Sequence, residues 1–439
     1  MQKRQDQRQL AGSYWEASRP PPRADRQLIG NAQFDVAVIG AGFAGLSAAM
    51  KLAEAGVSVC VLEAEHVGYG ASGRNGGFCC LGGTKLSIHQ LIQRYGLDGA
   101  RNFLAYQVAG INQVAQRLKA WGVDADCHSQ GEITLAHRPR DFDAFKAEAA
   151  FLKDKFGIKS RILDKSALTA EGYGGSGFYG GLHMPYGFAL NPMAYLYGLA
   201  DQVRKKGGRI FGKSAVTGVG RDGDRWRLDT EHGFVRAKRV ILAGNGYSKE
   251  TVPKWIHGRT LPVMSSIHVT RPMTDEELAA QGWTSDTMAS DSRILLHYFR
   301  LMPDKRFLFG TRGGIFENEP ALKAMHKRAR HDFNTMFPAW KGVESEYHWY
   351  GKVCLSRNLT PFVGQIPGMD GLYAAMGWHG SGVAMASLSG EKVAGLIMGS
   401  VRQEDLPEPL QHPFKRFPFP SLRKLYLQGA YWWYGYQDM

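Results

Sequence analysis

The stretch that decides the fold is residues 36–63, which read VAVIGAGFAGLSAAMKLAEAGVSVCVLE. The apolar run VAVI predicts a strand that is buried on both faces. A glycine turn, a helix and a second apolar strand follow, and an acid, Glu63, ends the stretch. This order of elements, more than the glycines alone, predicts a βαβ unit that binds a dinucleotide.

The glycines of the turn each have a physical task. Gly40 permits the tight turn, Gly42 lets the backbone approach a pyrophosphate, and Gly45 lets the helix lie close to the strand. The N–H groups at the start of the helix would face the phosphates, and the Glu63 carboxylate could accept hydrogen bonds from ribose hydroxyls. The residues of this stretch expected to hold the dinucleotide are Gly40, Gly42, Phe43, Ala44, Gly45, Glu63 and Ala64.

Composition narrows the class of protein. A chain of 439 residues with 44% hydrophobic residues suits two globular domains. The net charge is +14, but basic residues are spread along the chain and mixed with acids, which favours a generally basic surface over a nucleic-acid site. Five cysteines without a CxxC pair favour free thiols in a reducing cytoplasm. The sequence predicts neither a secretory signal nor a membrane-spanning segment, so we expect a cytoplasmic protein.

Periodicity predicts the remaining elements. We expect helices over 85–122, 141–157 and 165–170, and helices starting at Asn191-Pro192, at Pro320 and after the turn WHGSG. Strands are expected over 131–136, 209–219, 225–231, 234–240, 240–246, 297–302, 306–314 and 372–377.

Both ends of the chain differ from the body. Residues 1–33 form a polar arm in which Tyr14 and Trp15 are possible anchors. Residues 401–439 are rich in proline and aromatic residues, and we expect the cluster YWWYGY at 431–436 to pack against the body.

Three separated segments carry a family resemblance: the stretch 36–63, GYGASGRNGG at 68–77, and GWHGSGV at 377–383. Together they resemble the FAD-dependent amine and D-amino-acid oxidase (DAO) family. Within the family the chain is most similar to gamma-glutamylputrescine oxidases. The resemblance extends over nearly the whole chain, through the arm SYWEAS, VILAGNGY, YFRL and WYGKVCLSRNLTPFVG.

The resemblance implies an α/β fold, in which a discontinuous antiparallel-sheet substrate domain is inserted into a Rossmann-like (GR2-type) FAD-binding domain. We expect residues 34–84, 191–252 and 351–400 to form the FAD-binding domain. Residues 85–190 and 253–350 would then form the substrate domain, with 1–33 and 401–439 as terminal arms.

The late glycine turn is expected to meet the flavin ring. Negative charge develops on a flavin that receives a hydride, and backbone donors at a helix start can stabilise it. The turn departs from the family pattern, because histidine and serine have exchanged places at positions 379 and 381. The backbone donors should survive this exchange, and His379 either faces the substrate or lies in a polar wall. The cofactor-binding candidates of this turn are Gly380, Ser381, Gly382 and Val383.

The resemblance also implies that the loop 68–77 contacts the cofactor. Arg74 and Asn75 would contact the flavin or the pyrophosphate, because a guanidinium is a strong partner for phosphate oxygens. The other cofactor-binding candidates are Ser72, Gly76, Gly77, Val216, Ala243 and Gly244.

Cys354 leaves two possibilities for the flavin. Its segment KVCL resembles that of sarcosine oxidases, in which a cysteine holds the flavin covalently, but noncovalent relatives fit equally well. A buried free cysteine is the commoner outcome, so noncovalent FAD is the favoured prediction. Sarcosine as the substrate is disfavoured, since the positions of two lysines of those enzymes correspond here to Ala384 and Leu308.

Five side chains are candidates for contact with the substrate. An inward Arg312 would favour a substrate with a carboxylate, while an outward one would be surface charge. Trp378 could wall the substrate or pack in the core. The catalytic candidates are Tyr298, Arg300, Arg312, Trp378 and His379.

These observations predict an oxidase of a primary or secondary amine, such as a gamma-glutamylputrescine-like amine or an N-substituted amino acid. The amine would yield an imine and then an aldehyde, and O2 would be reduced to peroxide. An amino-acid dehydrogenase that passes electrons to a quinone or another carrier is an alternative, and a tRNA-modifying flavoprotein is a distant one. No metal and no nucleic-acid partner are expected.

Overall fold

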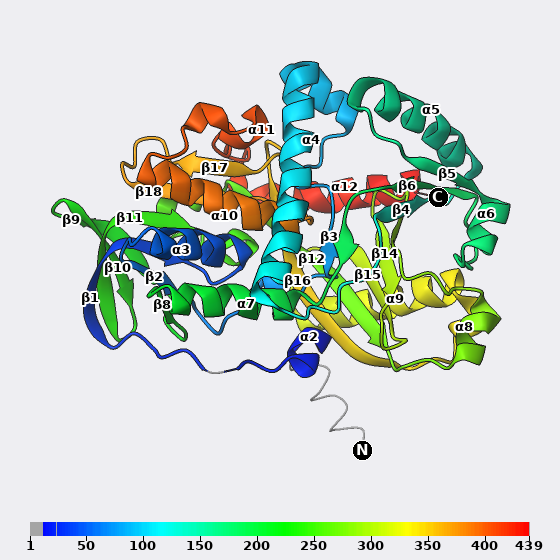
Figure 1. Cartoon of the computed structure of the whole chain (residues 1–439), viewed down its shortest axis with the longest axis horizontal. Helices are drawn as coiled ribbons and strands as arrows, with labels where there is room; N and C mark the ends of the chain where they lie inside the picture. The colour runs from blue at the N-terminus through cyan, green and yellow to red at the C-terminus, as the bar shows by residue number, and fades with distance from the viewer. Residues whose placement is uncertain (1–11, 23, 439) are drawn as a thin grey trace.

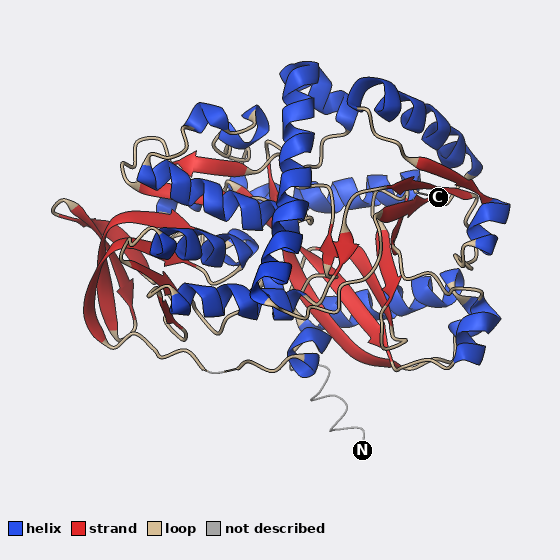
Figure 2. Ribbon diagram, viewed as in Figure 1, coloured by secondary structure: helices blue, strands red, loops and turns tan. Residues whose placement is uncertain are grey.

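The computed structural model describes residues 12–22 and 24–438. Two eight-stranded sheets form the two halves of the molecule. In Figure 1 the half with the first strand lies on the left, and the long helix α4 (Ile88–Trp121) runs between the halves. Figure 2 shows that helices cover the sheets of both halves.

The first sheet contains the βαβ unit that the sequence predicts. Its central order is β17-β18-β11-β1-β2-β8, and β9 and β10 extend it from β11 as antiparallel neighbours. The pairs β1–β2, β1–β11, β2–β8 and β11–β18 are parallel. The strands are β1 (Gly30–Ile39), β2 (Val59–Leu62), β8 (Arg209–Phe211), β9 (Gly218–Asp222), β10 (Arg225–Thr230), β11 (Gly233–Leu242), β17 (Phe362–Gln365) and β18 (Leu372–Met376).

Helices and strands cover opposite faces of this sheet. Val36 and Val38 of β1 pack into the core beneath α3 (Phe43–Glu54), α7 (Pro192–Lys205) and α10 (Val383–Met398). Ala37 packs on the other face, where β9 and β10 close a second core. The prediction that this strand is buried on both faces is therefore confirmed.

The second sheet has the order β16-β12-β15-β14-β13-β4-β6-β5. Its pairs are antiparallel except β4–β13, which is parallel and departs from the all-antiparallel expectation. The strands are β4 (Glu132–Leu135), β5 (Arg161–Asp164), β6 (Gly180–Met184), β12 (Thr260–Thr270), β13 (Met288–Asp291), β14 (His297–Leu301), β15 (Phe307–Gly314) and β16 (Ser345–Ser356).

One face of the second sheet carries an aromatic core. Phe299, Phe307 and Phe309 pack there with Phe337 and Trp340. The helices of this half are α5 (Pro139–Phe156), α6 (Lys165–Ala170), α8 (Asp275–Gln281) and α9 (Glu319–Met336). Because side chains alternate along a strand, the residues between these aromatics face the first half of the molecule.

The remaining elements are short, apart from the C-terminal helix. They are α2 (Tyr14–Ser18), β3 (Phe78–Cys79), β7 (Phe188–Ala189), α11 (Glu408–Gln411) and α12 (Arg423–Gln437), together with 3₁₀ turns at Ala71–Gly73, Asn245–Tyr247, Lys254–Ile256, Pro338–Trp340, Gln403–Asp405 and Pro420–Leu422.

Several boundaries differ from the sequence predictions. Helix α4 is kinked at Gly96, where φ is +72°. The two strands expected over 234–246 are the single strand β11, and the strand expected over 209–219 ends at Phe211. Strand β16 stays in the second sheet as far as Ser356, past the expected domain boundary at 350.

The prediction that the C-terminal aromatic cluster packs against the body is wrong for three residues. Trp432, Trp433 and Tyr436 are 74%, 57% and 69% exposed. The helical period of α12 explains the difference, because it turns Leu427 into the body and these three side chains away from it.

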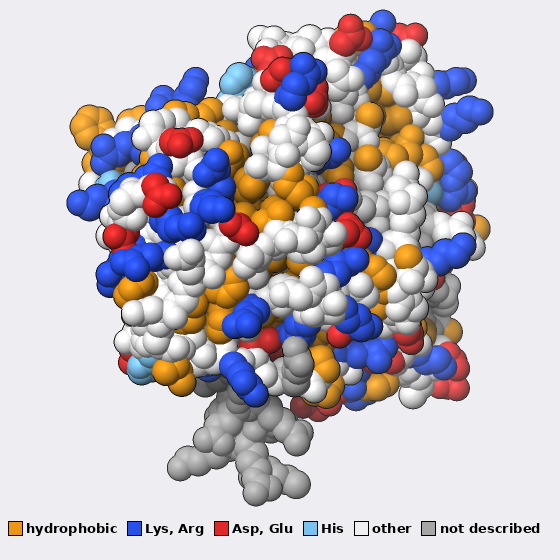
Figure 3. All heavy atoms as spheres, turned by 60° about the vertical axis from the view of Figure 1, so that its left-hand side comes forward, with side chains coloured by type: hydrophobic (Ala, Val, Ile, Leu, Met, Phe, Trp, Pro, Cys, Tyr) orange, Lys and Arg blue, Asp and Glu red, His pale blue; other side chains and the backbone are white. Residues whose placement is uncertain are grey.

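Figure 3 shows Lys and Arg scattered among acidic residues over the face drawn there, as the mixed charges of the sequence predict.

Arg300 of β14 connects the two halves. Its guanidinium donates to the Gly76 carbonyl at 3.1 Å and to the Leu190 carbonyl at 2.9 Å, and its Nη1 lies 2.9 Å from Nε2 of His128. Arg300 is 1% exposed, and burial lowers its pKa to about 9. The catalytic role expected for Arg300 is therefore not supported, because its donors are used to hold the loop before β3.

We predict that Arg300→Met lowers the free energy of unfolding by about 2–4 kcal/mol, because it leaves two buried carbonyl groups without donors. Urea unfolding measures the change, with Arg140→Met, at an exposed arginine, as the control. Equal stabilities of the two variants would contradict this role.

Candidate functional site

A long cavity between the two halves is lined by both glycine turns that the sequence singles out. The turn before α3 contributes Gly40 and Gly42, and the turn before α10 contributes Gly380 and Gly382. Gly42 and Gly382 are the N-cap residues of their helices. Because glycine cannot cap a helix with a side chain, neither N-cap residue uses the backbone N–H groups of its helix start, and those that no other side chain occupies can face a ligand.

The first turn is built as its glycines predict. Gly40 has φ +105°, and a Cβ there would lie 3.2 Å from the backbone of Ala243. A Cβ on Gly45 would lie 2.0 Å from the Gly40 carbonyl oxygen, so only glycine allows α3 to pack so close to β1. Gly45 thus shapes the turn from behind the cavity wall. It was expected among the residues that hold the dinucleotide, but it does not line the cavity.

Glu63 follows β2 and faces the same turn. Its carboxylate accepts hydrogen bonds from the backbone N–H of Ala41 at 2.7 Å and of Glu65 at 3.1 Å. Burial raises the pKa of Glu63, and these hydrogen bonds oppose the shift. The carboxylate is fixed at the end of the strand, where the sequence predicts the ribose.

The loop 68–77 closes the cavity over the helix start. The Ser72 hydroxyl accepts a hydrogen bond from Phe43 N–H at 3.0 Å. The Asn75 side chain donates to the Ala71 and Ser72 carbonyls and accepts from Gly77 N–H, so it holds the loop itself.

Arg74 lines the cavity, and two nitrogens of its guanidinium donate hydrogen bonds to backbone carbonyl groups. Its Nε donates to the Tyr69 carbonyl at 2.7 Å and its Nη1 to the Tyr350 carbonyl at 3.3 Å. Contact of Arg74 with the cofactor stays a prediction. The other expected cofactor residues in the wall are Ala44, Ala64, Gly76, Val216, Ala243 and Gly244, whereas Gly77 lies behind it.

The N-terminal helix α2 supports this loop. Ser13 donates to the Gly73 carbonyl at 2.8 Å, and the Trp15 indole donates to the Asn75 carbonyl at 2.7 Å. Trp15 is 2% exposed and is an anchor, as the sequence suggests.

The second turn lies against Arg312. Gly380 has φ +109°, and a Cβ there would lie 2.6 Å from Nη2 of Arg312. Ser381 and Val383 line the cavity beside it. Only glycine at position 380 leaves room for the Arg312 guanidinium next to the start of α10.

His379 lies behind this turn, so of the two alternatives that the sequence leaves open, the structure does not support the one in which it faces the substrate. It is 2% exposed, its Nδ1 lies 3.1 Å from the Gly83 carbonyl oxygen, and its Nε2 accepts from Ser356 N–H at 3.2 Å. Burial lowers the pKa of His379 to about 4, so the ring is neutral and positions the turn.

Three of the expected catalytic side chains line the cavity: Tyr298, Arg312 and Trp378. The Tyr298 hydroxyl is 2.9 Å from the Ser265 hydroxyl, which itself donates to the Thr311 carbonyl. Nη1 of Arg312 is buried and has no hydrogen-bond partner within residues 12–22 and 24–438. A guanidinium in this position can bind an anionic group of a ligand.

Other residues of the cavity wall escaped the sequence analysis: Cys80, Leu81, Glu132, Ser265, Ser290 and Leu296. A signal for Glu132 is present in GEITLA, where the glutamate alternates with the core residues Ile133 and Leu135. That alternation predicts that Glu132 lies on the face opposite the core, but the pairing of β4 with β13 is needed to place it in the cavity.

Comparison with known proteins agrees with this geometry. The model of the family DAO, described as FAD dependent oxidoreductase, matches residues 35–396. The chain belongs to the DAO family. The family resemblance read from the sequence is thereby confirmed, and so is the FAD cofactor.

Relatives cover nearly the whole chain. Gamma-glutamylputrescine oxidoreductase of Escherichia coli (strain K12) is 31% identical over 392 residues, 89% of either chain. The solved glycine oxidase from Bacillus cereus ATCC 14579 has a TM-score of 0.67 at 21% identity, over 84% of this chain and 96% of that one. L-proline dehydrogenase from P. horikoshii has a TM-score of 0.68 at 18% identity, over 87% and 98%. These solved structures show the shared fold.

The DAO-family protein is thus a FAD-dependent oxidoreductase of amines or amino acids. Its residues fit the cofactor, because two glycine-started helices and the Glu63 carboxylate face one cavity. In the described part of the chain, no helix has the length and apolar character to cross a membrane.

Cys354 of β16 lines the cavity and is 1% exposed. Burial raises the pKa of its thiol to about 12, which keeps the sulfur protonated and weakly nucleophilic. We predict that acid precipitation of the purified protein leaves the yellow flavin in the supernatant. Colour that stays with wild-type protein but not with Cys354→Ser would show a covalent bond instead.

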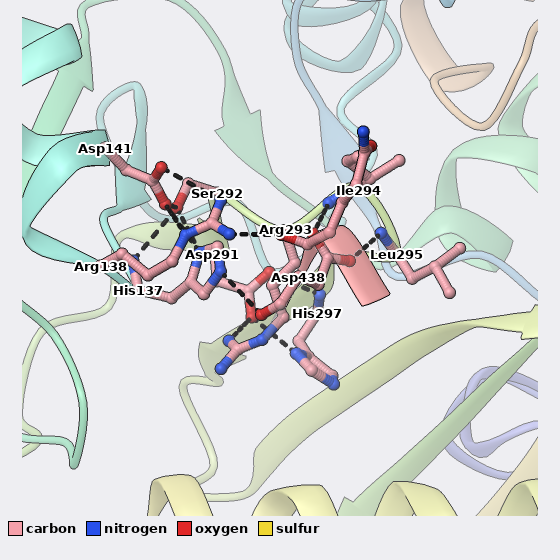
Figure 4. Close-up of polar contacts among 11 residues, drawn as sticks. His137, Arg138, Asp141, Asp291, Ser292, Arg293, Ile294, Leu295, His297 and Asp438 are labelled. Atoms are coloured by element: carbon pink, nitrogen blue, oxygen red, sulfur yellow. Dashed lines mark hydrogen bonds and ion pairs between the residues drawn. The ribbon is translucent and has the colours of Figure 1, made fainter. Parts of the chain in front are cut away.

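Asp438, which follows α12, holds the loop that borders the cavity at Leu296. The Asp438 carboxylate accepts from the N–H groups of Ile294 and Leu295 at 2.9 and 3.0 Å (Figure 4). In the same cluster His297 lies 2.6 Å from Asp291, and its other ring nitrogen lies 3.2 Å from Asp332. Burial would lower the pKa of His297, but the two carboxylates outweigh it and raise this pKa to about 9.

This raised pKa predicts a pH dependence of stability. His297 binds its proton more tightly in the folded state, so its contribution is complete below pH 6.5 and is lost as the pH rises through 9. We expect the free energy of unfolding to fall by about 3 kcal/mol between pH 6.5 and pH 9.5 through this group. In His297→Gln this part of the fall should vanish, while the exposed-site control His331→Gln should keep it. The same slope in both variants would contradict the prediction.

Proposed function

We propose that this protein is an oxidase of a primary or secondary amine that also carries a carboxylate, with O2 as the electron acceptor. Two substrate types combine an amine with a carboxylate in this way: gamma-glutamylputrescine-like amines and N-substituted amino acids. The observation that carries the proposal is Nη1 of Arg312, which is buried beside the Gly380 turn without a hydrogen-bond partner among the described residues, in the cavity that both glycine turns line.

The residues around the cavity have distinct tasks in this proposal. Arg312 would bind the carboxylate and so orient the substrate next to the helix start of α10. Trp378 and Tyr298 would form walls that exclude water. Backbone N–H groups of the turn 380–383 would stabilise negative charge on the cofactor.

FAD held in this cavity would supply the electron-accepting chemistry, as the acceptor of a hydride from the carbon that bears the substrate nitrogen. The nitrogen must be neutral for this transfer, because its lone pair forms the new C=N bond. Arg312 and Tyr298 are not strong bases, and in this proposal the amine binds in its deprotonated form. The imine product then reacts with water to give an aldehyde or keto compound.

Anaerobic mixing with a panel of amines tests the proposal. We predict that polyamine conjugates or N-substituted amino acids that carry a carboxylate bleach the flavin absorbance, and that air restores it with formation of hydrogen peroxide. Arg312→Met should lower kcat/KM for such a substrate about 100-fold, because it removes a charge-assisted hydrogen bond, and should change the rate with a neutral amine far less. A flavin that no amine bleaches would contradict the proposal, and reoxidation by a dye but not by O2 would indicate the dehydrogenase.

A further inference from the structure

Glu132 places a carboxylate in the substrate end of the cavity. On β4, Ile133 and Leu135 point into the aromatic core, and Glu132 lies on the opposite face, in the cavity wall. Ser290 of the neighbouring strand β13 and Tyr298 of β14 line the cavity as well. Three adjacent strands thus present polar side chains to one space.

The carboxylate has no counter-ion in the described part of the chain. The group that interacts with Glu132 is the Cys80 thiol, a weak donor. Burial raises the pKa of Glu132 to about 7, and the Cys80 thiol opposes this shift. An enclosed carboxylate without a cation is costly, and a cationic ligand group would remove that cost.

The backbones of Glu132 and Arg312 lie well apart. The two residues belong to β4 and β15, which are separated by β13 and β14 in the sheet. Three strand spacings correspond to roughly 14 Å between their backbones. The cavity therefore offers a negative group and a positive group at separate places, and only Arg312 lies against the turn before α10.

We propose that Glu132 binds a second, non-reacting cationic nitrogen of the substrate, so that the preferred substrates are amines that carry another ammonium group. The inference rests on the proposed amine oxidation. The nitrogen that reacts must be neutral, and a carboxylate beside it would hold its proton. Glu132 therefore suits a nitrogen that stays charged throughout the reaction.

The test uses pairs of amines of equal length that differ in one terminal ammonium group. The pairs are 1,4-diaminobutane with pentylamine, and lysine with 2-aminoheptanoate. Anaerobic flavin reduction is measured at pH 8 for the wild type, Glu132→Gln and Ser290→Ala. Equilibrium binding of the same compounds is read from the flavin absorbance, independently of turnover.

We expect the wild type to prefer the compound with the ammonium group in at least one pair. In Glu132→Gln that preference should fall 10- to 100-fold through weaker binding, with the rate at saturation unchanged, because a charged hydrogen bond is lost. Ser290→Ala should change both members of a pair by the same factor.

If Glu132→Gln keeps the preference for the compound with the ammonium group, the inference is overturned. It is also overturned if Glu132→Gln lowers the saturating rate with both members of a pair, because Glu132 would then be a base for the reacting amine. If Glu132→Gln loses its flavin, Glu132→Asp is read instead, and it should keep the preference with weaker binding. If no amine reduces the wild-type flavin, amine oxidation itself fails, and the binding measurements still test Glu132.

Discussion

Close backbone packing around α3 is the constraint on which the cavity depends. A Cβ on Gly45 would lie 2.0 Å from the Gly40 carbonyl oxygen, and one on Gly390 of α10 would lie 2.1 Å from the Ala44 carbonyl oxygen. Glycine at these two positions lets α3 touch both β1 and α10. As a result, two helices that are 340 residues apart in the chain begin at one cavity, where their N–H groups can face one cofactor.

The second sheet complements this arrangement through the alternation of its strands. Phe299, Phe307 and Phe309 fill the aromatic core, and Tyr298 and Arg312 on the opposite face of the same strands face the cofactor half. The same strands therefore stabilise the fold with one face and shape the substrate space with the other. Arg300 lies on the same face as Tyr298, but its guanidinium donates hydrogen bonds to the carbonyl groups of Gly76 and Leu190. Arg300 therefore joins the two halves.

The cofactor half could be predicted from the sequence because its contacts are local. The turn at Gly40, the acid at Glu63 and the turn at Gly380 each lie next to a strand or helix with a clear pattern. The substrate half depends on pairings between distant strands, so the sequence alone did not place Glu132 in the cavity. The sequence also left open whether His379 faces the substrate or lies in a polar wall. His379 lies in a recognised motif, but the left-handed conformation of its backbone (φ +51°) directs its ring to Gly83 and Ser356. Nothing local in the motif signals that direction.

A crystal structure of the purified protein with its own flavin tests the central claim most directly. We expect the adenine ribose at Glu63, the pyrophosphate at the helix start after Gly42, and the isoalloxazine ring against residues 380–383, with Arg312 and Glu132 on the substrate side. A ring directed away from that turn, or the phosphates of another ligand at Gly42, would contradict it.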